Sequence, residues 1–358
     1  MPTLDKKNPY NIFVINPGST STKVAHFLNE RMISQQTFSH TSELHQFPSL
    51  WDQLEFRFSC IQQFLQEKNI SELDATVGRG GLLKPVTRGT YAVNETMLND
   101  ALKGVQGQHA ANLGCALAHR IGNLYNCPAY VVDPVSVDEF ADVARLSGHP
   151  RIERRTLSHA LNLRAAALWV AKMLNVPPTQ QNLVVAHMGG GISIAAIQQG
   201  NIVDVNDAAS SGPFSPERSG SLPLQQFMDL CFSGEYTPDQ MRKMVMGEGG
   251  LKAYLGTSDL QEVEDRIAHG DRHAELVYHA MIYQTAKEIA AMATVSKGQL
   301  QAIVLTGGLA NSKQFVRLLS ERISFLAPVH VLPGELEMQA MAAGAYRVLS
   351  GEESINIY

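Results

Sequence analysis

The sequence predicts an α/β fold made of two related domains, and an internal repeat is the main reason for this prediction. The first half opens with an apolar run at 11–15, a loop of small residues and two more β-like stretches. The same order of elements returns from Asn182: strand, glycine loop, strand, turn, strand. Asn11 and Asn182 are 171 residues apart, and so are Gly18 and Gly189. A common interval across a whole series of elements indicates a duplicated domain.

Apolar stretches bounded by turn residues predict the strands in order along the chain. Several of these strands run directly into a glycine-rich loop or a single charged residue. In open α/β sheets, ligands collect beyond the carboxyl ends of the strands. We therefore expect Gly18, Arg79, Asp133, Gly189 and Gly307 to lie where a cleft can form. The predicted strands are 11–15, 23–27, 31–38, 75–77, 130–132, 183–187, 192–197, 201–205 and 302–305.

Three helices are predicted from apolar periodicity and end signals. Ser158 is suited to be the N-cap of a helix that continues to about Leu174 and stops before Pro177. Apolar residues recur at intervals of three and four from 274 to 295, which predicts a long helix with one face in the core. An alanine-rich segment at 338–349 predicts the last helix.

Composition excludes several classes of protein. The chain has 358 residues, of which 44% are hydrophobic and 18% charged, so it is globular and long enough for two domains. A net charge of −5 argues against a nucleic-acid-binding surface. There is no apolar stretch of membrane-spanning length, and residues 1–8 do not open an export signal, so we expect a cytoplasmic location. The scattered cysteines form neither a disulfide framework nor a metal knuckle.

The loops carry groups suited to binding phosphate and carboxylate. Residues 18–23 offer backbone amides, hydroxyl groups and one ammonium group, although they do not match the Walker A pattern, and no GxGxxG occurs in the chain. Arg79 and Arg218 stand among small residues, which we expect to leave their guanidinium groups accessible. Such a group can hold a carboxylate or phosphoryl group through two parallel hydrogen bonds. A surface ion pair is the alternative interpretation of each arginine.

Other single polar residues allow two interpretations. Asp133 follows a strand and can act as a base or electrostatic anchor, or simply cap the next turn. His159 and His187 are candidates for an active site or for structural roles, and His109 has the weakest independent case. Two glutamates precede the last helix, where the helix dipole alone favours carboxylates; binding of Mg²⁺ is the other interpretation.

Taken together, these motifs resemble the acetate and sugar kinase/Hsp70/actin superfamily and, within it, the acetokinase family of short-chain carboxylate kinases. The similarity extends over nearly the whole chain. It implies duplicated ribonuclease H-like (actin-like ATPase) domains with an ATP cleft between them. The first would span 1–155 and be completed by the C-terminal helix 338–358, and the second, nucleotide-binding domain would span 156–337. The motifs that carry the resemblance are 14–23, 77–81, 131–136, 186–191, 216–220, 305–312 and 333–338.

The resemblance also implies a role for each site residue. The catalytic residues would be Arg79, Asp133, His159, His187 and Arg218. Phosphate and nucleotide would be bound by Asn16, Gly18, Ser19, Ser21, Lys23, Gly189, Gly190, Gly191, Gly307 and Gly308. Arg79 and His109 would bind the acceptor carboxylate. Asn16 and Glu337 would serve Mg²⁺, with Glu335 as the other candidate for the glutamate.

The implied reaction is reversible transfer of a phosphoryl group from ATP to a short-chain fatty acid. Gly190 replaces the asparagine of acetate kinases and the chain is shorter than theirs, which favours the butyrate branch of the family. Acetate, propionate and isobutyrate remain alternative acceptors, because one methylene discriminates only weakly. A sugar kinase or an ATP-driven binding module is a more distant alternative. The expected partners are the carboxylate and ATP or ADP, without nucleic acid or membrane, in a homo-oligomer that is a dimer or larger.

Overall fold

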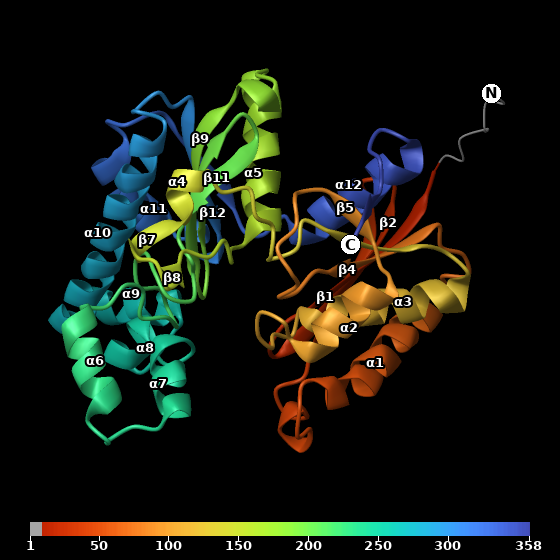
Figure 1. Ribbon diagram of the computed structural model, residues 1–358, viewed down its shortest axis with the longest axis horizontal. Coiled ribbons are helices and arrows are strands. Elements are labelled where there is room, and N and C mark those ends of the chain that lie inside the picture. The colour runs from red at the N-terminus through yellow and green to blue at the C-terminus, as the bar shows by residue number, and fades with distance from the viewer. Residues whose placement is uncertain (1–8) are drawn as a thin grey trace. The chain divides into compact units, whose positions relative to one another are not determined.

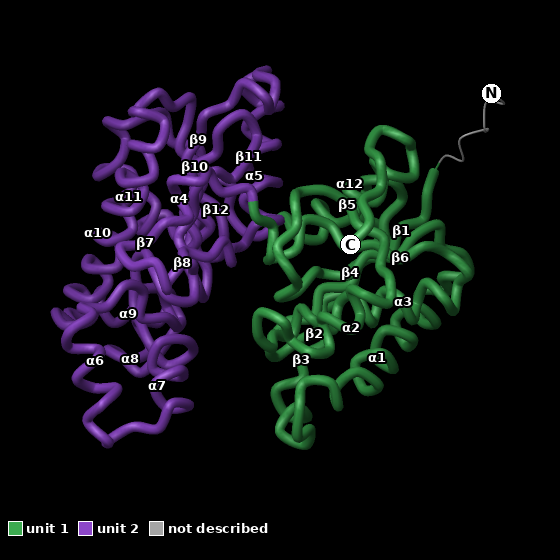
Figure 2. Tube along the Cα trace, in the orientation of Figure 1, with its two compact units in different colours: residues 1–138, 336–358 green, residues 139–335 purple. Residues whose placement is uncertain are grey.

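The computed structural model describes residues 9–358, which form two compact units (Figures 1 and 2). Unit 1 contains the chain up to Asp138 together with Leu336–Tyr358, and unit 2 contains Glu139–Glu335. Residues 1–8, on which the expectation of no export signal rests, lie outside the described residues. Among the residues that are described, no helix is both long and apolar enough to cross a membrane.

Unit 1 is built on a seven-stranded sheet with the strand order β14-β5-β6-β4-β1-β2-β3. Its central strand β1 is an apolar run buried on both faces, whereas side chains of the edge strand β3 alternate between exposed and half-buried. The strands are β1 (Asn11–Pro17), β2 (Ser21–Leu28), β3 (Arg31–Ser39), β4 (Ala75–Arg79), β5 (Thr90–Ala92), β6 (Ala129–Val132) and β14 (Asn356–Ile357).

Helices cover both faces of this sheet. On one face α1 (Leu54–Glu67) and α3 (Asn112–Tyr125) form a core with apolar side chains of β1 and β2, and α2 (Glu95–Lys103) packs beside α3. The opposite face is covered by α12 (Glu337–Ser350), which contacts β1, β4 and β6. Figure 1 shows α12, drawn in blue, beside strands from the start of the chain.

Unit 2 is built on a five-stranded sheet with the order β11-β10-β9-β12-β13. The long helix α10 (Arg272–Val295) and its neighbour α11 (Lys313–Ile323) form the main core on one face, and α5 (Ala160–Leu174) packs on the other (Figure 1). A separate two-stranded ribbon joins β7 and β8. The strands are β7 (Leu146–His149), β8 (Ile152–Glu153), β9 (Asn182–Met188), β10 (Ile192–Gln198), β11 (Asn201–Val205), β12 (Ala302–Gly307) and β13 (Val329–Pro333).

Unit 2 contains eight α-helices among its described residues, and α10 is the longest of them. Asp271 caps α10 by accepting a hydrogen bond from the Ala274 amide (2.9 Å). The helices are α4 (Asp142–Arg145), α5 (Ala160–Leu174), α6 (Leu224–Phe232), α7 (Pro238–Val245), α8 (Gly250–Leu255), α9 (Leu260–Ala268), α10 (Arg272–Val295) and α11 (Lys313–Ile323).

The two sheets share one topology, which confirms the predicted duplication. In unit 1, β1 pairs antiparallel with β2 and parallel with β4, and β4 pairs parallel with β6. In unit 2, β9 pairs antiparallel with β10 and parallel with β12, and β12 pairs parallel with β13. The interval of 171 residues relates Asn16 near the end of β1 to His187 near the end of β9. Both polar residues therefore occupy the same position of the repeated sheet.

The division between the units differs from the predicted domain boundary at 155/156. It falls at 138/139, because the segment after it is tied to β11. The Ala141 amide donates to the Val203 carbonyl (3.0 Å), and Arg154 forms an ion pair with Asp204 (2.6 Å).

The predicted start of α5 is wrong by one residue. His159, not Ser158, occupies the N-cap position, and no side chain caps the helix there. The His159 amide instead donates to Ser193 Oγ (3.4 Å) on β10, so a contact between elements replaces the local cap.

Candidate functional site

In unit 1, polar groups from three elements meet at the carboxyl end of β1. Asn16 and Lys23 are directly opposite each other in the antiparallel pair β1–β2, so their side chains share a face of the sheet. That is the face covered by α12, whose first residue is Glu337. Asn16 Nδ2 donates to Glu337 Oε2 (2.7 Å), which joins the strand end to the helix N-terminus.

Arg79, the last residue of β4, reaches the same carboxylate. Its Nη2 lies 3.2 Å from Glu337 Oε1, and the side chains are only 5% and 12% exposed. The expectation of an accessible guanidinium group is therefore wrong for Arg79. Its other terminal nitrogen, Nη1, is buried without a hydrogen-bond partner among the described residues. A buried donor of this kind is costly unless an acceptor arrives.

Close backbone packing fixes the position of Arg79. A Cβ atom on Gly78 would lie 2.0 Å from the Gly114 carbonyl oxygen, and one on Gly114 would lie 2.1 Å from the Arg79 carbonyl oxygen. Only glycine at both positions allows α3 to lie directly against β4. We expected the glycines beside Arg79 to leave its side chain accessible. Gly78 instead allows the close packing of β4 against α3.

The β1–β2 loop contains the predicted phosphate-binding hydroxyl groups. The Gly18 amide donates to the Ser21 carbonyl (2.8 Å) and closes the turn. Ser19 is exposed at the tip, whereas Ser21 and Lys23 are half-buried.

Asp133 and His109 lie in two other loops of unit 1. Asp133 follows β6 with a φ of +38°, a backbone conformation that is rare outside glycine. Its Oδ1 accepts the Gly89 amide (2.8 Å), so the aspartate holds the loop before β5 rather than a turn shown to follow it in sequence. His109 is exposed in the loop before α3, and its Nδ1 accepts the Ala111 amide (3.1 Å).

In unit 2, His187 and His159 stack at the carboxyl end of β9. Their ring centroids are 4.1 Å apart and the rings are inclined by 26°. His159 Nδ1 lies 2.9 Å from Ser193 Oγ, and Asn162 Nδ2 lies 2.7 Å from His187 Nδ1. Because the amide nitrogen can only donate, His187 Nδ1 accepts and the ring proton lies on Nε2.

The loop 189–191 meets Arg218 directly. A Cβ atom on Gly189 would lie 3.4 Å from His187 Nε2, and one on Gly191 would lie 2.3 Å from Arg218 Nη1. The guanidinium group therefore lies against the Gly191 backbone, and Arg218 Nη1 donates to the Ala208 carbonyl (3.0 Å). Arg218 is half-buried, and burial lowers the pKa of its guanidinium group.

Gly307 and Gly308 follow at the end of β12. Gly307 has a φ of +93°, and a Cβ atom there would lie 2.4 Å from the Met188 carbonyl oxygen, so both conformation and packing require glycine. Gly308 has open space on its side-chain side.

The two candidate glutamates for Mg²⁺ belong to different units. Glu335 is the last residue of unit 2, whereas Glu337 belongs to unit 1 with Asn16 and Arg79.

The side chains of Asn16 and Glu337 suit a Mg²⁺ ion that takes only some of its ligands from the protein. Magnesium prefers oxygen ligands and usually keeps water and phosphate among them. Asn16 and Glu337 offer an amide oxygen and a carboxylate. Residues 9–358 contain no cluster of three or more histidine, cysteine or acidic side chains that could hold a metal alone. The residues therefore fit a nucleotide-bound magnesium ion better than a protein cage.

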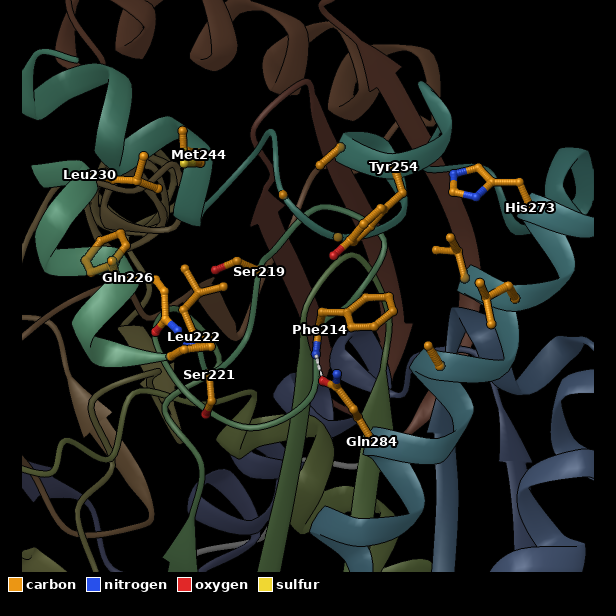
Figure 3. Close-up of a pocket in the computed structure, with 18 residues that line it drawn as sticks. Phe214, Ser219, Ser221, Leu222, Gln226, Leu230, Met244, Tyr254, His273 and Gln284 are labelled. Carbon is orange, nitrogen blue, oxygen red and sulfur yellow. Dashed lines mark hydrogen bonds between the residues drawn. The ribbon is translucent and has the colours of Figure 1, made fainter. Parts of the chain in front are cut away.

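A cavity of about 560 Å³ in unit 2 is lined by a different set of residues. Figure 3 shows Phe214 and Tyr254 in its wall, with Gln284 Oε1 accepting the Phe214 amide (3.2 Å). The lining comes mainly from α6, α8 and α10 and is mostly apolar. None of the predicted site residues lines it, and such a surface does not suit phosphate.

The structure thus brings the predicted residues together in two groups, one in each unit. Asn16, Lys23, Arg79 and Glu337 gather in unit 1, and His159, His187 and Arg218 lie at or beside the strand ends and glycine loop of unit 2. The sequence interpretation missed Asn162 and Ser193, which hold the two imidazole rings. A lone asparagine in the apolar helix 160–174 is the signal that could have identified Asn162.

Comparison with known proteins finds relatives over nearly the whole chain. The profile of the acetokinase family matches residues 154–354. A probable butyrate kinase 2 of Caldanaerobacter subterraneus subsp. tengcongensis is 49% identical over 98% of this chain and 99% of its own length. The butyrate kinase 2 of Clostridium acetobutylicum is 47% identical over the same shares.

A solved structure shows the shared fold. The acetate kinase of Porphyromonas gingivalis superposes with a TM-score of 0.76 over 95% of this chain and 100% of that one, at 17% identity. The two units are therefore the duplicated domains of an actin-like ATPase fold. With nearly half of its residues identical to those of the two relatives over almost its full length, this chain belongs to the acetokinase family.

Proposed function

We propose that the chain transfers the γ-phosphoryl group of ATP to the carboxylate of butanoate, giving butanoyl phosphate and ADP, and catalyses the reverse reaction. As a member of the acetokinase family it is a phosphotransferase with a carboxyl group as acceptor. The choice of butanoate rests on the names of the two relatives with nearly half of their residues in common. The cytoplasmic location and the homo-oligomer expected from the sequence stay predictions.

The observation that carries the proposal is the buried Nη1 of Arg79, which has no partner among residues 9–358. A carboxylate oxygen would satisfy this donor while Nη2 keeps its contact with Glu337. We assign the acceptor carboxylate to this position. His109, in the loop before α3, would be the second residue that binds it. A hydroxyl acceptor, as in a sugar kinase, has less use for a buried cation.

The chemistry asks for alignment and charge neutralisation more than for proton transfer. A carboxylate is already a nucleophile at neutral pH, so no general base is needed, and in-line transfer depends on holding the groups in place. Lys23, Arg218 and the Nε2–H of His187 would offset negative charge on the transferring phosphoryl group. The hydroxyl groups of Ser19 and Ser21 would add neutral donors to the same group.

Backbone amides would bind the nucleotide phosphates at the loop 189–191, and the turn at Gly307 and Gly308 would receive the adenosine. Asn16 and Glu337 would hold Mg²⁺, which when bound offsets phosphate charge. Asp133 would orient one of the two arginines or a water held by Mg²⁺, while its Oδ1 keeps the hydrogen bond from the Gly89 amide.

The test is formation of acyl phosphate, trapped as the hydroxamate, with ATP, Mg²⁺ and a series of acids: acetate, propionate, butyrate, isobutyrate and valerate. We expect the highest kcat/KM with butyrate. Arg79→Ala should lower it by about 100-fold or more, the usual scale for losing a charged donor that acts on the transition state. Arg120→Ala is the matched control, because this partly exposed arginine contacts Glu55 and the Phe58 ring, neither of which is assigned to the site.

The outcomes separate the alternatives. A maximum with another acid would keep the reaction and overturn the choice of butanoate. Absence of product with every acid would overturn the proposed reaction. Full activity in Arg79→Ala would overturn the assignment of the carboxylate to Arg79.

A further inference from the structure

Arg57 on α1 is a buried cation outside the set of predicted site residues. Its side chain is 0% exposed, and among residues 9–358 it has no carboxylate within ion-pair distance. Its guanidinium group makes four hydrogen bonds, all to neutral oxygens. Burying a charge without a counter-charge is unfavourable, so a buried arginine of this kind calls for an explanation.

The oxygens that Arg57 contacts belong mainly to the β1–β2 hairpin. Nη1 donates to the Ser21 carbonyl (2.8 Å) and to Thr22 Oγ1 (2.9 Å). The Ser21 carbonyl also accepts the Gly18 amide (2.8 Å), which closes the turn. Nε and Nη2 both donate to Gln53 Oε1, at 3.2 and 2.9 Å, which holds the guanidinium plane. Arg57 thus donates a hydrogen bond to the Ser21 carbonyl, the same group that closes the hairpin turn.

His40 strengthens the same contact. Its Nε2 lies 2.9 Å from Thr22 Oγ1, and its amide donates to the Thr20 carbonyl (2.8 Å). Burial and the charge of Arg57 lower the pKa of His40, so the neutral ring can accept the Thr22 hydroxyl proton. Arg57, Thr22 and His40 therefore form one chain of hydrogen bonds behind the hairpin.

Strand geometry places the phosphate-directed groups on the opposite side. Neighbouring strand residues point to opposite faces, so Thr22 faces α1 while Ser21 and Lys23 face the other way. Lys23 shares its face with Asn16, which contacts Glu337 of α12. The buried guanidinium therefore holds the hairpin from behind the groups that the proposed function assigns to the phosphoryl group.

We propose that Arg57 is a positioning residue that fixes the β1–β2 hairpin, so that Ser19, Ser21 and Lys23 meet the phosphoryl group in transfer. This inference rests on the proposed function. The positive charge, set in a medium of low dielectric constant behind the hairpin, adds attraction for the same anion. Burial lowers the pKa of Arg57 to about 10, which leaves it charged at neutral pH.

The test compares Arg57→Met, which removes charge and donors, with Arg57→Lys, which keeps the charge but cannot hold the same set of oxygens. We expect kcat to fall about 10- to 100-fold in Arg57→Met, with partial recovery in Arg57→Lys. The KM for the acid should stay within about two-fold, because Arg79 is untouched. Arg120→Met is the matched control and should keep its kcat.

Hydrogen exchange at the Gly18 amide gives a readout that does not need activity. We expect it to accelerate in Arg57→Met while amides of β9 and β12 in unit 2 are unchanged. If Arg57→Met does not fold, Thr22→Val removes only the hydroxyl that Arg57 contacts and should lower kcat several-fold at constant KM.

Two results would overturn the inference. One is an unchanged kcat in both Arg57→Lys and Thr22→Val. The other is a fall in kcat that is accompanied, in every Arg57 variant, by a comparable loss of acid affinity and of thermal stability. If wild-type protein makes no acyl phosphate, the proposed function fails. The Gly18 amide then still shows whether Arg57 orders the hairpin.

Discussion

At the scale of single residues, Gly191 is the position in the glycine loop with the least room for a side chain. A methyl group there would lie 2.3 Å from Arg218 Nη1 and 2.5 Å from Cζ of the same guanidinium group, which is itself held by the Ala208 carbonyl. At Gly190 the nearest atom is the end of the flexible Glu217 side chain, at 3.2 Å. The two neighbouring glycines therefore make a matched pair.

We expect Gly191→Ala to lower kcat by about 100-fold, because it displaces Arg218 from its place beside the loop. Gly190→Ala should lower kcat much less than Gly191→Ala does, since only the Glu217 carboxylate has to move. Steady-state kinetics of both variants, with thermal melting to show that they are folded, checks this. Equal losses in the two variants would mean that the loop amides, and not Arg218, are sensitive to substitution.

The burial of Arg57 gives no sequence signal, and sequence reasoning therefore missed this residue. Arg57 lies on an amphipathic helix, where an arginine normally belongs to the exposed face. Only the fold brings α1 behind the hairpin and turns Arg57 inward. Arg79 was predicted as a ligand-binding residue, but its pairing with Glu337 joins residues 258 positions apart and could not be read from local pattern.

At the scale of elements, the short strand β14 depends on a side chain as well as on its ladder. Tyr358 Oη accepts the Lys84 amide (3.0 Å) and donates to Asp100 Oδ2 (2.9 Å). These contacts tie the end of the chain to the loop before β5 and to α2. The strand itself pairs with β5 over two residue pairs, so the tyrosine is a large part of its attachment.

Tyr358→Phe should lower the free energy of unfolding by about 1 kcal/mol at neutral pH, since both hydrogen bonds are lost. Burial and the bond to Asp100 raise the pKa of Tyr358 from 10 to about 12. The stabilising contribution is therefore complete below pH 10 and is lost as the pH rises through about 12. Denaturant titrations across this range check it, with Tyr254→Phe, at a largely exposed tyrosine, as control. An unchanged profile in Tyr358→Phe would contradict the role of the hydroxyl.

The elements that could be predicted from sequence are those with strong local patterns. The apolar runs of β1, β4, β9 and β12 are buried on both faces, and turn residues mark their ends. The short strands β5 and β14 carry no such pattern, because pairing alone makes them strands. Much of 213–268 is partly exposed helix with mixed polarity, so no apolar periodicity there predicts separate helices.

At the scale of the whole molecule, the two units differ in how the chain builds them. Unit 2 is one continuous segment, and its core cluster contains only residues of that segment. Unit 1 needs α12 from the other end of the chain, where Met338, Met341, Ala342 and Ala345 are buried against the sheet.

We therefore expect a fragment of residues 139–335 to fold alone and to melt cooperatively. A fragment ending at 138 should not, because one face of β1, β4 and β6 lacks its cover. Appending residues 336–358 through a flexible linker should restore folding. Circular dichroism and thermal melting of the three fragments give the answer, and a stable fold in the fragment ending at 138 would contradict the need for α12.

The same discontinuity sets an order of events on the ribosome. Residues 9–138 emerge first, yet the helix that covers their sheet is synthesised only after the whole of unit 2. At about 5 to 20 residues per second this interval lasts roughly 10 to 40 s. For that time the earlier half of the chain exposes an apolar sheet face to the surrounding cell, while the later half can complete its core. The nascent chain is thus a natural client for chaperones that bind uncovered apolar strands, and the second unit to be made is the first that can finish folding.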